Sequence, residues 1–320
     1  MVRAILPAAG FQPASLVGSA HDAASVAEKR FQLTPVLVFA AITLVLACLG
    51  IFGVVSYTVA QRRVEMGIRN NRYKAMVPTV VGELGLKGRV HAAEARHARA
   101  HTTHKLKFTL PGPMTMVDTL YDAHYGSREK LATAFAEILN EEARAIEAAG
   151  ADVIQFDEPA FNVYFDEVRD WGIAALERAA QGLKCTTAVH ICYGYGIKAN
   201  IEWKKTLGSE WRQYENTFPL LARSAIGQIS LECANSHVPL ELIGLLKGKD
   251  VLVGAIDVAT ERVETPEEVA ATLRAALKYV PAERIYPCTN CGMVPLAREI
   301  ARGKLKALGA GAALVRRELS

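Results

Sequence analysis

The hydrophobic positions of this chain gather in short runs that alternate with longer amphipathic stretches. Between the runs lie stretches with helical periodicity, such as residues 129–149, 166–182 and 266–279. Continuously apolar strands separated by helices predict a parallel sheet covered by helices, as in an α/β barrel. The runs are short and rich in β-branched residues, as buried strands are, and comprise residues 106–110, 152–156, 186–191, 228–231, 251–256 and 284–286.

Side chains with metal-binding or acid–base chemistry lie at the ends of these runs. Because the carboxyl ends of barrel strands meet at one mouth, we expect these side chains to lie close together. They are Asp157, His190, Cys192, Glu232, Asp257 and Cys291. Imidazole, thiolate and carboxylate groups form the ligand mixture that holds Zn²⁺. The pattern predicts a zinc site made by His190, Cys192, Glu232 and Cys291.

Six short segments carry a family resemblance. They are Val77-Pro-Thr-Val-Val-Gly82, Leu110-Pro-Gly-Pro-Met-Thr115, Ile154-Gln-Phe-Asp-Glu-Pro-Ala160, His190-Ile-Cys-Tyr193, Ile229-Ser-Leu-Glu232 and Thr289-Asn-Cys-Gly292. In this order they resemble the catalytic domain of the cobalamin-independent methionine synthase family. The resemblance covers residues 72–320.

The resemblance implies an activity and roles for individual residues. In that family a (β/α)8 barrel binds zinc and transfers a methyl group to the sulfur of homocysteine. The resemblance makes His190, Cys192, Glu232 and Cys291 the zinc ligands, and it makes Asp157 the carboxylate that meets the substrate ammonium group. Bound Zn²⁺ suits this reaction because it deprotonates an incoming thiol, and the thiolate is the nucleophile.

The methyl donor is left open by two departures from the family pattern. Thr119 stands where folate-dependent members carry a Trp, and Ala259 stands where they carry a His. The resemblance associates those two residues with holding and protonating the pterin. Methyl-folate, methyl-corrinoid and another small methyl donor are therefore all compatible with the sequence.

The front of the expected barrel has no counterpart in the sequence. In the family, two strands precede the segment at Val77, and residues upstream of it match neither of them. The predicted fold class is therefore α/β, a (β/α)8 TIM-type barrel lacking its first strands. An unclosed barrel leaves exposed sheet edges, so enzyme activity does not follow from the fold alone. The alternative to a methyltransferase is therefore a non-catalytic remnant, tethered to the membrane by the apolar N-terminal segment.

The first part of the chain has a different character. Residues 31–61 contain no charged side chain, and the segment at about 35–58 is apolar and long enough to cross the roughly 30 Å core of a bilayer. More Lys and Arg residues follow this segment than precede it, so we expect the following barrel domain to face the cytoplasm. The predicted division is residues 1–71, with one transmembrane helix, and residues 72–320, the barrel domain.

This N-terminal part has a resemblance of its own. Residues 46–57 and 59–69 look like the last part of a permease subunit of the macrolide-exporter type of ABC transporter. Such a permease needs several helices, whereas this segment supplies one. The resemblance implies a junction of two unrelated pieces near residues 69–73.

The amino-acid composition adds only a little to what can be said about partners and cellular compartment. A net charge of +4 over 320 residues, with no basic patch interleaved with aromatics, argues against a nucleic-acid partner. Six cysteines in a chain of this length are typical of a reducing cytosol, where thiols bind metals more often than they pair. Cys288 and Cys291 could form a separate redox or metal motif, and the histidines at 91, 97, 101 and 104 a second metal site. We expect a solvated loop for those histidines and for residues 204–212.

Overall fold

The computed structural model describes residues 64–69, 73–195 and 198–320. The predicted transmembrane helix at 35–58 lies outside the described residues. Within them, no helix combines the length and the apolar character that a membrane crossing requires.

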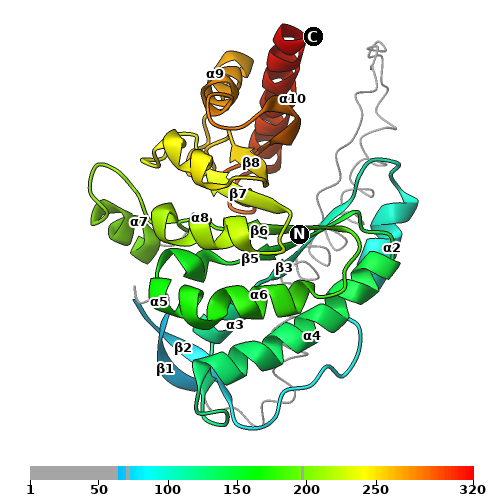
Figure 1. The fold of residues 1–320 in the computed structure, drawn as a ribbon, viewed down its shortest axis with the longest axis vertical. Coiled ribbons are helices and arrows are strands. Elements are labelled where there is room, and N and C mark those ends of the chain that lie inside the picture. The colour runs from blue at the N-terminus through cyan, green and yellow to red at the C-terminus, as the bar shows by residue number, and fades with distance from the viewer. Residues whose placement is uncertain (1–63, 70–72, 196–197) are drawn as a thin grey trace, which may run out of the picture.

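A six-stranded parallel sheet forms the centre of the fold (Figure 1). The sheet contains all six strands that the apolar runs predicted, with ends that differ by one or two residues. In spatial order the strands are β3 (Lys107–Pro111), β5 (Val153–Asp157), β6 (Thr186–His190), β7 (Gln228–Glu232), β8 (Asp250–Gly254) and β9 (Ile285–Cys288). Each strand pairs with the next strand of the sheet along the chain, so all the carboxyl ends point the same way.

The strand register separates a polar face of this sheet from an apolar one. Asp157, His190, Ser230, Leu252 and Tyr286 are successive partners across five strands and therefore share a face. The row one residue earlier points to the opposite face. That row is buried almost throughout and consists of Leu110, Phe156, Val189, Ile229, Val251 and Ile285.

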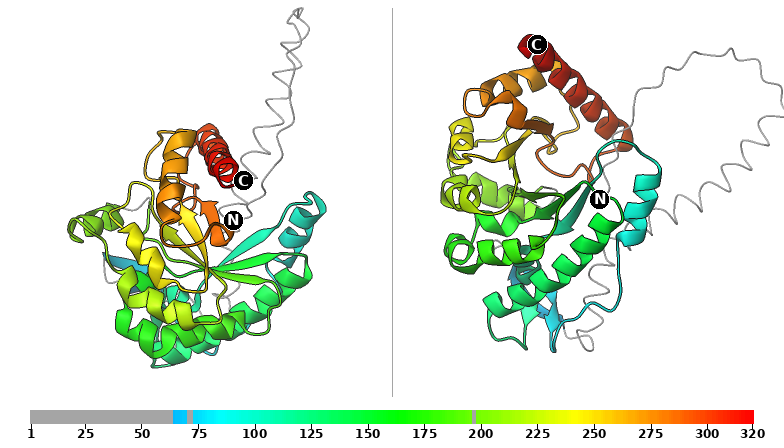
Figure 2. Two further views of the ribbon diagram at one scale, coloured as in Figure 1. Left: turned by 45° about the horizontal axis from the view of Figure 1, so that its top comes forward. Right: turned by 45° about the vertical axis from the view of Figure 1, so that its right-hand side comes forward.

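Helices cover the outer side of the curved sheet (Figure 2). They include α4 (Arg128–Ala148), α6 (Ile173–Ala180), α8 (Tyr214–Arg223), α9 (Pro266–Ala276) and α10 (Arg298–Leu319). Their buried side chains join the apolar row of the sheet in one hydrophobic core. The sequence marks some helix starts clearly. At α9, Thr265 and Glu268 form a reciprocal capping box around Pro266, so the helix begins where the local chemistry dictates.

Shorter elements surround this centre. The remaining helices are α2 (Ala92–Ala100), α3 (Pro113–Asp118), α5 (Phe165–Glu167) and α7 (Lys198–Lys205), with short 3-10 turns at Pro159–Asn162, Leu240–Leu245 and Ala282–Arg284. The helix expected at 166–182 contains a π-helical stretch at Val168–Gly172 between α5 and α6. Residues 92–100, expected to lie in a loop, form α2, and His91 before it is buried.

A second, three-stranded sheet lies beside the first. It consists of β1 (Val64–Arg69), β2 (Tyr73–Val80) and β4 (Tyr121–Asp122). The β1–β2 hairpin is antiparallel and spans the predicted domain boundary at residue 72. Among the described residues, no further strand pairs with the outer edge of β3 or of β9. The six-stranded sheet is therefore open in this part of the chain, as the resemblance predicted.

The C-terminal helix is tied to the loop after β8 by a buried charge. The Lys304 side chain on α10 is 0% exposed, and its Nζ donates to both carboxylate oxygens of Glu264 at 3.1 Å. The same ammonium donates to the carbonyl oxygens of Asp257 and Arg262. The Glu264 carboxylate accepts in addition from the Asp257 N–H at 3.0 Å. One lysine therefore fixes the whole turn between β8 and α9.

Replacing this lysine should destabilise the fold strongly. In Lys304→Met the buried Glu264 carboxylate loses its cation, which costs about 3–5 kcal/mol of unfolding free energy. Urea unfolding followed by circular dichroism measures the loss. The matched control is Lys306→Met on the exposed side of α10, which should stay within about 0.5 kcal/mol of wild type. A loss below about 1 kcal/mol in Lys304→Met would contradict a structural role for this pair.

Candidate metal centre

Three of the four predicted zinc ligands lie together at the carboxyl end of the sheet. One ligand atom from each of His190, Cys192 and Cys291 lies within 4.8 Å of the other two. His190 ends β6, Cys192 follows two residues later, and Cys291 follows β9. The carboxyl ends of two strands that are far apart in the sequence therefore supply the cluster.

The imidazole of His190 is oriented as a ligand. Its Nδ1 lies 2.9 Å from the Oγ of Ser230, its register partner on β7. Its Nε2 is buried and has no hydrogen-bond partner among the described residues. A buried nitrogen without a hydrogen-bond partner beside two thiols is suited to bind a metal ion, and the contact between Nδ1 and Ser230 is compatible with the tautomer whose Nε2 carries no proton.

The dimensions of the cluster also fit zinc. With Zn–S bonds near 2.3 Å and Zn–N bonds near 2.1 Å, tetrahedral ligand atoms lie roughly 3.5–3.8 Å apart. The observed limit of 4.8 Å allows those separations after small side-chain movements. Two sulfurs and one imidazole nitrogen are soft or borderline donors, which zinc accepts readily. The residues therefore fit a Zn²⁺ ion.

The electrostatics of the cluster favour the thiolate form of Cys291. The hydrogen bond from Cys192 lowers the pKa of Cys291 to about 4, against the opposing effect of burial and with further help from His190. The same hydrogen bond and burial raise the pKa of Cys192. Burial alone would lower the pKa of His190, but its interactions with Cys291 and Asp157 outweigh burial and raise that pKa.

Glu232, the fourth predicted ligand, lies beside the cluster but is not part of it. Its Oε1 accepts the backbone N–H of Tyr193 at 2.7 Å, and its Oε2 accepts the Tyr195 hydroxyl at 2.7 Å. Burial raises the pKa of Glu232, while Lys204 and these hydrogen bonds oppose the rise. Both carboxylate oxygens are thus engaged by protein donors.

Asp157, the predicted substrate-binding carboxylate, is the register partner of His190. It is partly exposed on the polar face of the sheet, and the Gln155 side-chain amide donates to its Oδ1 at 2.8 Å. Lys107 donates in turn to Oε1 of Gln155 at 2.9 Å. This chain of contacts orients Asp157 next to the cluster.

The neighbouring Glu158 holds a second loop of the site in place. Its carboxylate is fully buried and accepts from the N–H groups of Met114 and Thr115 and from the Thr115 hydroxyl, at the start of α3. A Cβ at position 112 would overlap the Glu158 side chain, so the loop after β3 needs glycine there. Burial raises the pKa of Glu158 to about 7 despite these hydrogen bonds.

The comparisons with known proteins agree with this geometry. The family model described as the catalytic domain of cobalamin-independent synthase matches residues 59–313. The chain belongs to the cobalamin-independent methionine synthase family. The match begins before the predicted boundary at residue 72 and includes the hairpin strand β1.

Relatives and solved structures of the family extend this finding. The chain is 34% identical over 218 residues to the methionine synthase of Sulfurisphaera tokodaii, covering 68% of this chain and 59% of that protein. The corresponding protein of Thermococcus kodakarensis is 34% identical over 229 residues, or 71% of this chain and 62% of that protein. The chain thus spans about three fifths of the length of these curated relatives.

Among solved structures, a B12-independent methionine synthase from Shewanella sp. W3-18-1 in complex with selenomethionine is similar to this chain. It is 65% identical with a TM-score of 0.78, over 80% of this chain and 75% of that one. A putative vitamin-B12 independent methionine synthase from Listeria monocytogenes is 14% identical, with a TM-score of 0.56 over 76% of this chain and 73% of that one, and shares the fold.

Sequence reasoning missed the residues that surround Glu232 in this family member. Residues 204–212 are largely solvated, as expected, but Trp211 is buried and the Lys204 ammonium lies 3.7 Å from the centre of the Tyr195 ring. No motif or pattern in the sequence marked Tyr195 as part of the site. The available signal was the density of aromatic residues at positions 193–214, which is high for a loop and a short helix.

Two alternative metal sites do not form in the part of the chain that the structure describes. The cluster at His190 is the one group of three or more His, Cys, Asp or Glu side chains with converging ligand atoms in residues 64–69, 73–195 and 198–320. The histidines at 91, 97, 101 and 104 therefore do not make a second site. The Cys288 thiol is buried, and its Sγ lies 3.9 Å from the same Ser230 Oγ that contacts His190.

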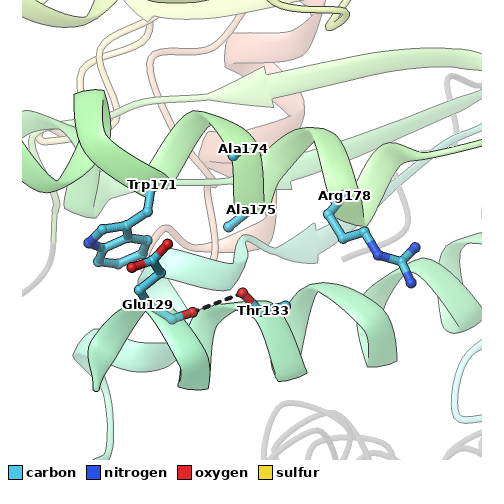
Figure 3. A pocket seen from close by; sticks show the side chains of 6 residues that line it. All are labelled: Glu129, Thr133, Trp171, Ala174, Ala175 and Arg178. Carbon is cyan, nitrogen blue, oxygen red and sulfur yellow. Dashed lines mark hydrogen bonds between the residues drawn. The ribbon is translucent and has the colours of Figure 1, made fainter.

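A surface cavity of about 220 Å³ lies between α4 and the helical segment that contains α6 (Figure 3). It is lined by Glu129, Thr133, Trp171, Ala174, Ala175 and Arg178. None of these residues belongs to the metal cluster or contacts Asp157 or Glu232 in the structure. The cavity is therefore separate from the candidate centre.

Replacing Glu158 should test how the α3 loop is held. In Glu158→Gln the amide nitrogen cannot accept from Met114 or Thr115, so unfolding free energy should fall by about 1–3 kcal/mol at pH 6. Wild type loses stability as pH rises through the raised folded-state pKa of about 7, and glutamine has no proton to lose. The difference in unfolding free energy between wild type and Glu158→Gln, measured by urea unfolding, should therefore narrow from pH 6 to pH 8. A difference in unfolding free energy that stays constant over this range would show that the carboxylate is ionised throughout.

Proposed function

We propose that the chain transfers a methyl group to the thiol of homocysteine, giving methionine, with one Zn²⁺ held by His190, Cys192, Glu232 and Cys291. The observation that carries the proposal is the convergence of the ligand atoms of His190, Cys192 and Cys291 within 4.8 Å at the carboxyl end of the sheet. Membership of the cobalamin-independent methionine synthase family supports it. The selenomethionine bound to the Shewanella relative, a selenium analogue of the product, supports it further.

The metal supplies one piece of chemistry when bound: it lowers the pKa of a coordinated substrate thiol, so that the nucleophilic thiolate forms near neutral pH. The protein's own residues set the charge of that site. The lowered pKa of Cys291 favours its thiolate form, and Cys192 would release its proton on binding the metal. The two thiolates would neutralise the dication, and the Glu232 carboxylate would add further negative charge. Such an electron-rich site keeps a substrate sulfur nucleophilic.

Asp157 is proposed to bind the ammonium group of homocysteine. The carboxylate shares a row of the sheet with His190, so it lies on the same side as the metal cluster. Gln155 donates to Oδ1 of this carboxylate and orients it, and its negative charge suits a charge-assisted hydrogen bond with an ammonium group. An amino acid anchored by Asp157 presents its side-chain sulfur toward the cluster.

The methyl donor is proposed to be a methyl-folate, a methyl-corrinoid or another small methyl carrier. Thr119 is buried, and its hydroxyl donates to the Met116 carbonyl oxygen rather than pointing to a ligand. The backbone N–H of Ala259 donates to the Asp257 carboxylate, and Ala259 has no side chain that can give a proton. Neither position carries the pterin-handling group of folate-dependent members, so each donor class must be assayed separately.

The proposal extends to the N-terminal part of the chain. The apolar segment at 35–58 is proposed to tether a cytoplasmic catalytic domain to the inner face of the membrane, and the permease resemblance of residues 46–69 concerns the same part. The open edges of β3 and β9 among the described residues favour the alternative of a tethered, non-catalytic remnant. A methyl-transfer assay on the full-length protein in detergent distinguishes a tethered enzyme from a tethered, non-catalytic remnant.

Zinc content tests the metal site directly. Protein purified under reducing conditions should contain about one Zn²⁺ per chain, and Cys192→Ser should lose it because a hydroxyl is a poor donor for this ion. Cys185→Ser removes a half-buried thiol outside the cluster and should keep full zinc content. Atomic absorption measures both. Retention of stoichiometric zinc by Cys192→Ser and by Cys291→Ser would rule out the site.

Asp157→Asn tests the proposed substrate contact. Asparagine keeps the size of the side chain and can still accept from Gln155, but it loses the charge that pairs with an ammonium group. The loss of about 1.5–3 kcal/mol should raise the KM for homocysteine about ten- to a hundredfold. Zinc content serves as the control and should stay at the wild-type level. An unchanged KM with every donor would assign the ammonium to another group.

A further inference from the structure

A line of three hydrogen-bonded side chains runs along the polar face of the sheet and ends at Asp157. Lys107 lies at the start of β3, Gln155 in the middle of β5, and Asp157 at the end of β5. The Lys107 Nζ donates to Oε1 of Gln155 at 2.9 Å. The Gln155 Nε2 donates to Oδ1 of Asp157 at 2.8 Å. The proposed substrate contact involves only the last of these residues directly.

Strand geometry explains why the three side chains can meet. Gln155 and Asp157 are two residues apart on β5, so both point to the polar face of the sheet. The register partner of Gln155 on β3 is Thr109, two residues after Lys107, so Lys107 points to the same face. Lys107 itself lies opposite Val153, and its long side chain reaches Gln155 diagonally. The line therefore leads from the amino end of the sheet to its mouth.

The lysine fixes the direction of both hydrogen bonds. An ammonium group has three donors and no acceptor, so the atom of Gln155 that faces it must be the carbonyl oxygen Oε1. The amide nitrogen Nε2 then lies at the other end of the group, where it donates to Asp157. The two ends of an amide are otherwise hard to tell apart, and here the cation assigns them. Lys107 thus ensures that Asp157 meets a donor rather than a second acceptor.

The Asp157 carboxylate needs such a support because the sheet fixes its backbone alone. The Asp157 carbonyl oxygen accepts the N–H of Gly112, and its register partners are Pro111 and His190. The side chain is partly exposed at the end of the strand, where backbone pairing leaves its torsions unset. Ordering a side chain when a ligand arrives costs entropy. A carboxylate that is already held in place reduces this cost and binds more tightly.

The charges along the line also favour this arrangement. A cation at the amide oxygen polarises the amide and makes its N–H a stronger donor, because linked hydrogen bonds reinforce one another. The group that contacts Asp157 is nevertheless a neutral amide. The carboxylate therefore keeps the negative charge that an ammonium ligand requires, while Lys107 supports it through Gln155.

We propose that Lys107 and Gln155 are positioning residues for the amino group of the substrate. Lys107 orients the Gln155 amide, and the amide holds the Asp157 carboxylate in the rotamer that pairs with the ammonium group of homocysteine. The inference rests on the proposed contact between Asp157 and that ammonium group. It extends amino-acid recognition from one carboxylate at the mouth to a supporting line that begins on β3, since binding groups need a second layer that locks their rotamers.

The test compares L-homocysteine with 4-sulfanylbutanoate, which has the same thiol and carboxylate but lacks the amino group. Isothermal titration calorimetry of the zinc-loaded protein gives both dissociation constants. The Kd of 4-sulfanylbutanoate divided by that of L-homocysteine measures what the ammonium group contributes. In Lys107→Met this ratio should fall about three- to tenfold, the size of one hydrogen bond. The Kd of 4-sulfanylbutanoate should stay at the wild-type level, which a general loss of structure would not allow.

Further variants make the test specific. Lys105→Met replaces an exposed lysine two positions earlier and should keep the wild-type ratio. Gln155→Met removes both hydrogen bonds from the middle of the line, should lower the ratio at least as far as Lys107→Met, and decides the question if Lys107→Met does not fold. Asp157→Asn should lower the ratio further. Adding Lys107→Met to Asp157→Asn should have no additional effect on the ratio, because the lysine acts through the carboxylate.

The outcomes separate this inference from the proposed function. A wild-type protein that binds neither ligand, or binds both equally, would overturn the proposed ammonium contact and this inference with it. A ratio that falls in Asp157→Asn but is unchanged in Lys107→Met and Gln155→Met would overturn the positioning role alone. Equal weakening of both ligands in Lys107→Met would also overturn it, because the lysine would then support the fold rather than the ammonium site.

Discussion

The parallel register of β5, β6 and β7 is the constraint on which the candidate site depends. It places Asp157, His190 and Ser230 side by side in one row of the sheet. A shift of one residue in either pairing would turn the row toward the helices and send apolar side chains into the site. The buried row formed by Phe156, Val189 and Ile229 prevents such a shift, because its burial under the helices is the main stabilising contribution of these strands.

The site is arranged around competition for a few polar atoms. The Nδ1 of His190 is occupied by Ser230, so its Nε2 faces the thiols, while the oxygens of Glu232 are occupied by Tyr193 and Tyr195. Hydrogen bonds from the surrounding residues thus orient the side chains that are proposed to bind the metal.

The sequence predicted the strands well because their signal is local. Each apolar run, such as the one that became β7, carries its own length and β-branched composition. The convergence of His190, Cys192 and Cys291 was also predictable, since carboxyl ends of parallel strands meet at one edge. The contacts that hold the Glu232 carboxylate were not predictable, because one donor is Tyr195, which is 37 positions away in the chain. No periodicity records a contact of that kind.

The other gaps in the sequence-based prediction have similar physical causes. The helix α2 and the burial of His91 depend on the Glu142 carboxylate of α4, which accepts the N–H of His91 at 2.6 Å. The β1–β2 hairpin pairs residues on both sides of a change in composition, where the resemblances to two different families suggested a break. Tertiary partners decided both cases, and local patterns carry no information about such partners.

The buried Lys304 determines when, during synthesis of the chain, the turn after β8 can form. The turn that carries Asp257 takes its final hydrogen bonds from a side chain 47 residues further along, on the last helix of the chain. During translation, β8 and its turn leave the ribosome before Lys304 has been synthesised. Until then the Glu264 carboxylate has no ammonium partner and stays solvated. This corner of the mouth is therefore completed only after α10 has been made, and a chain truncated before residue 304 would leave it unformed.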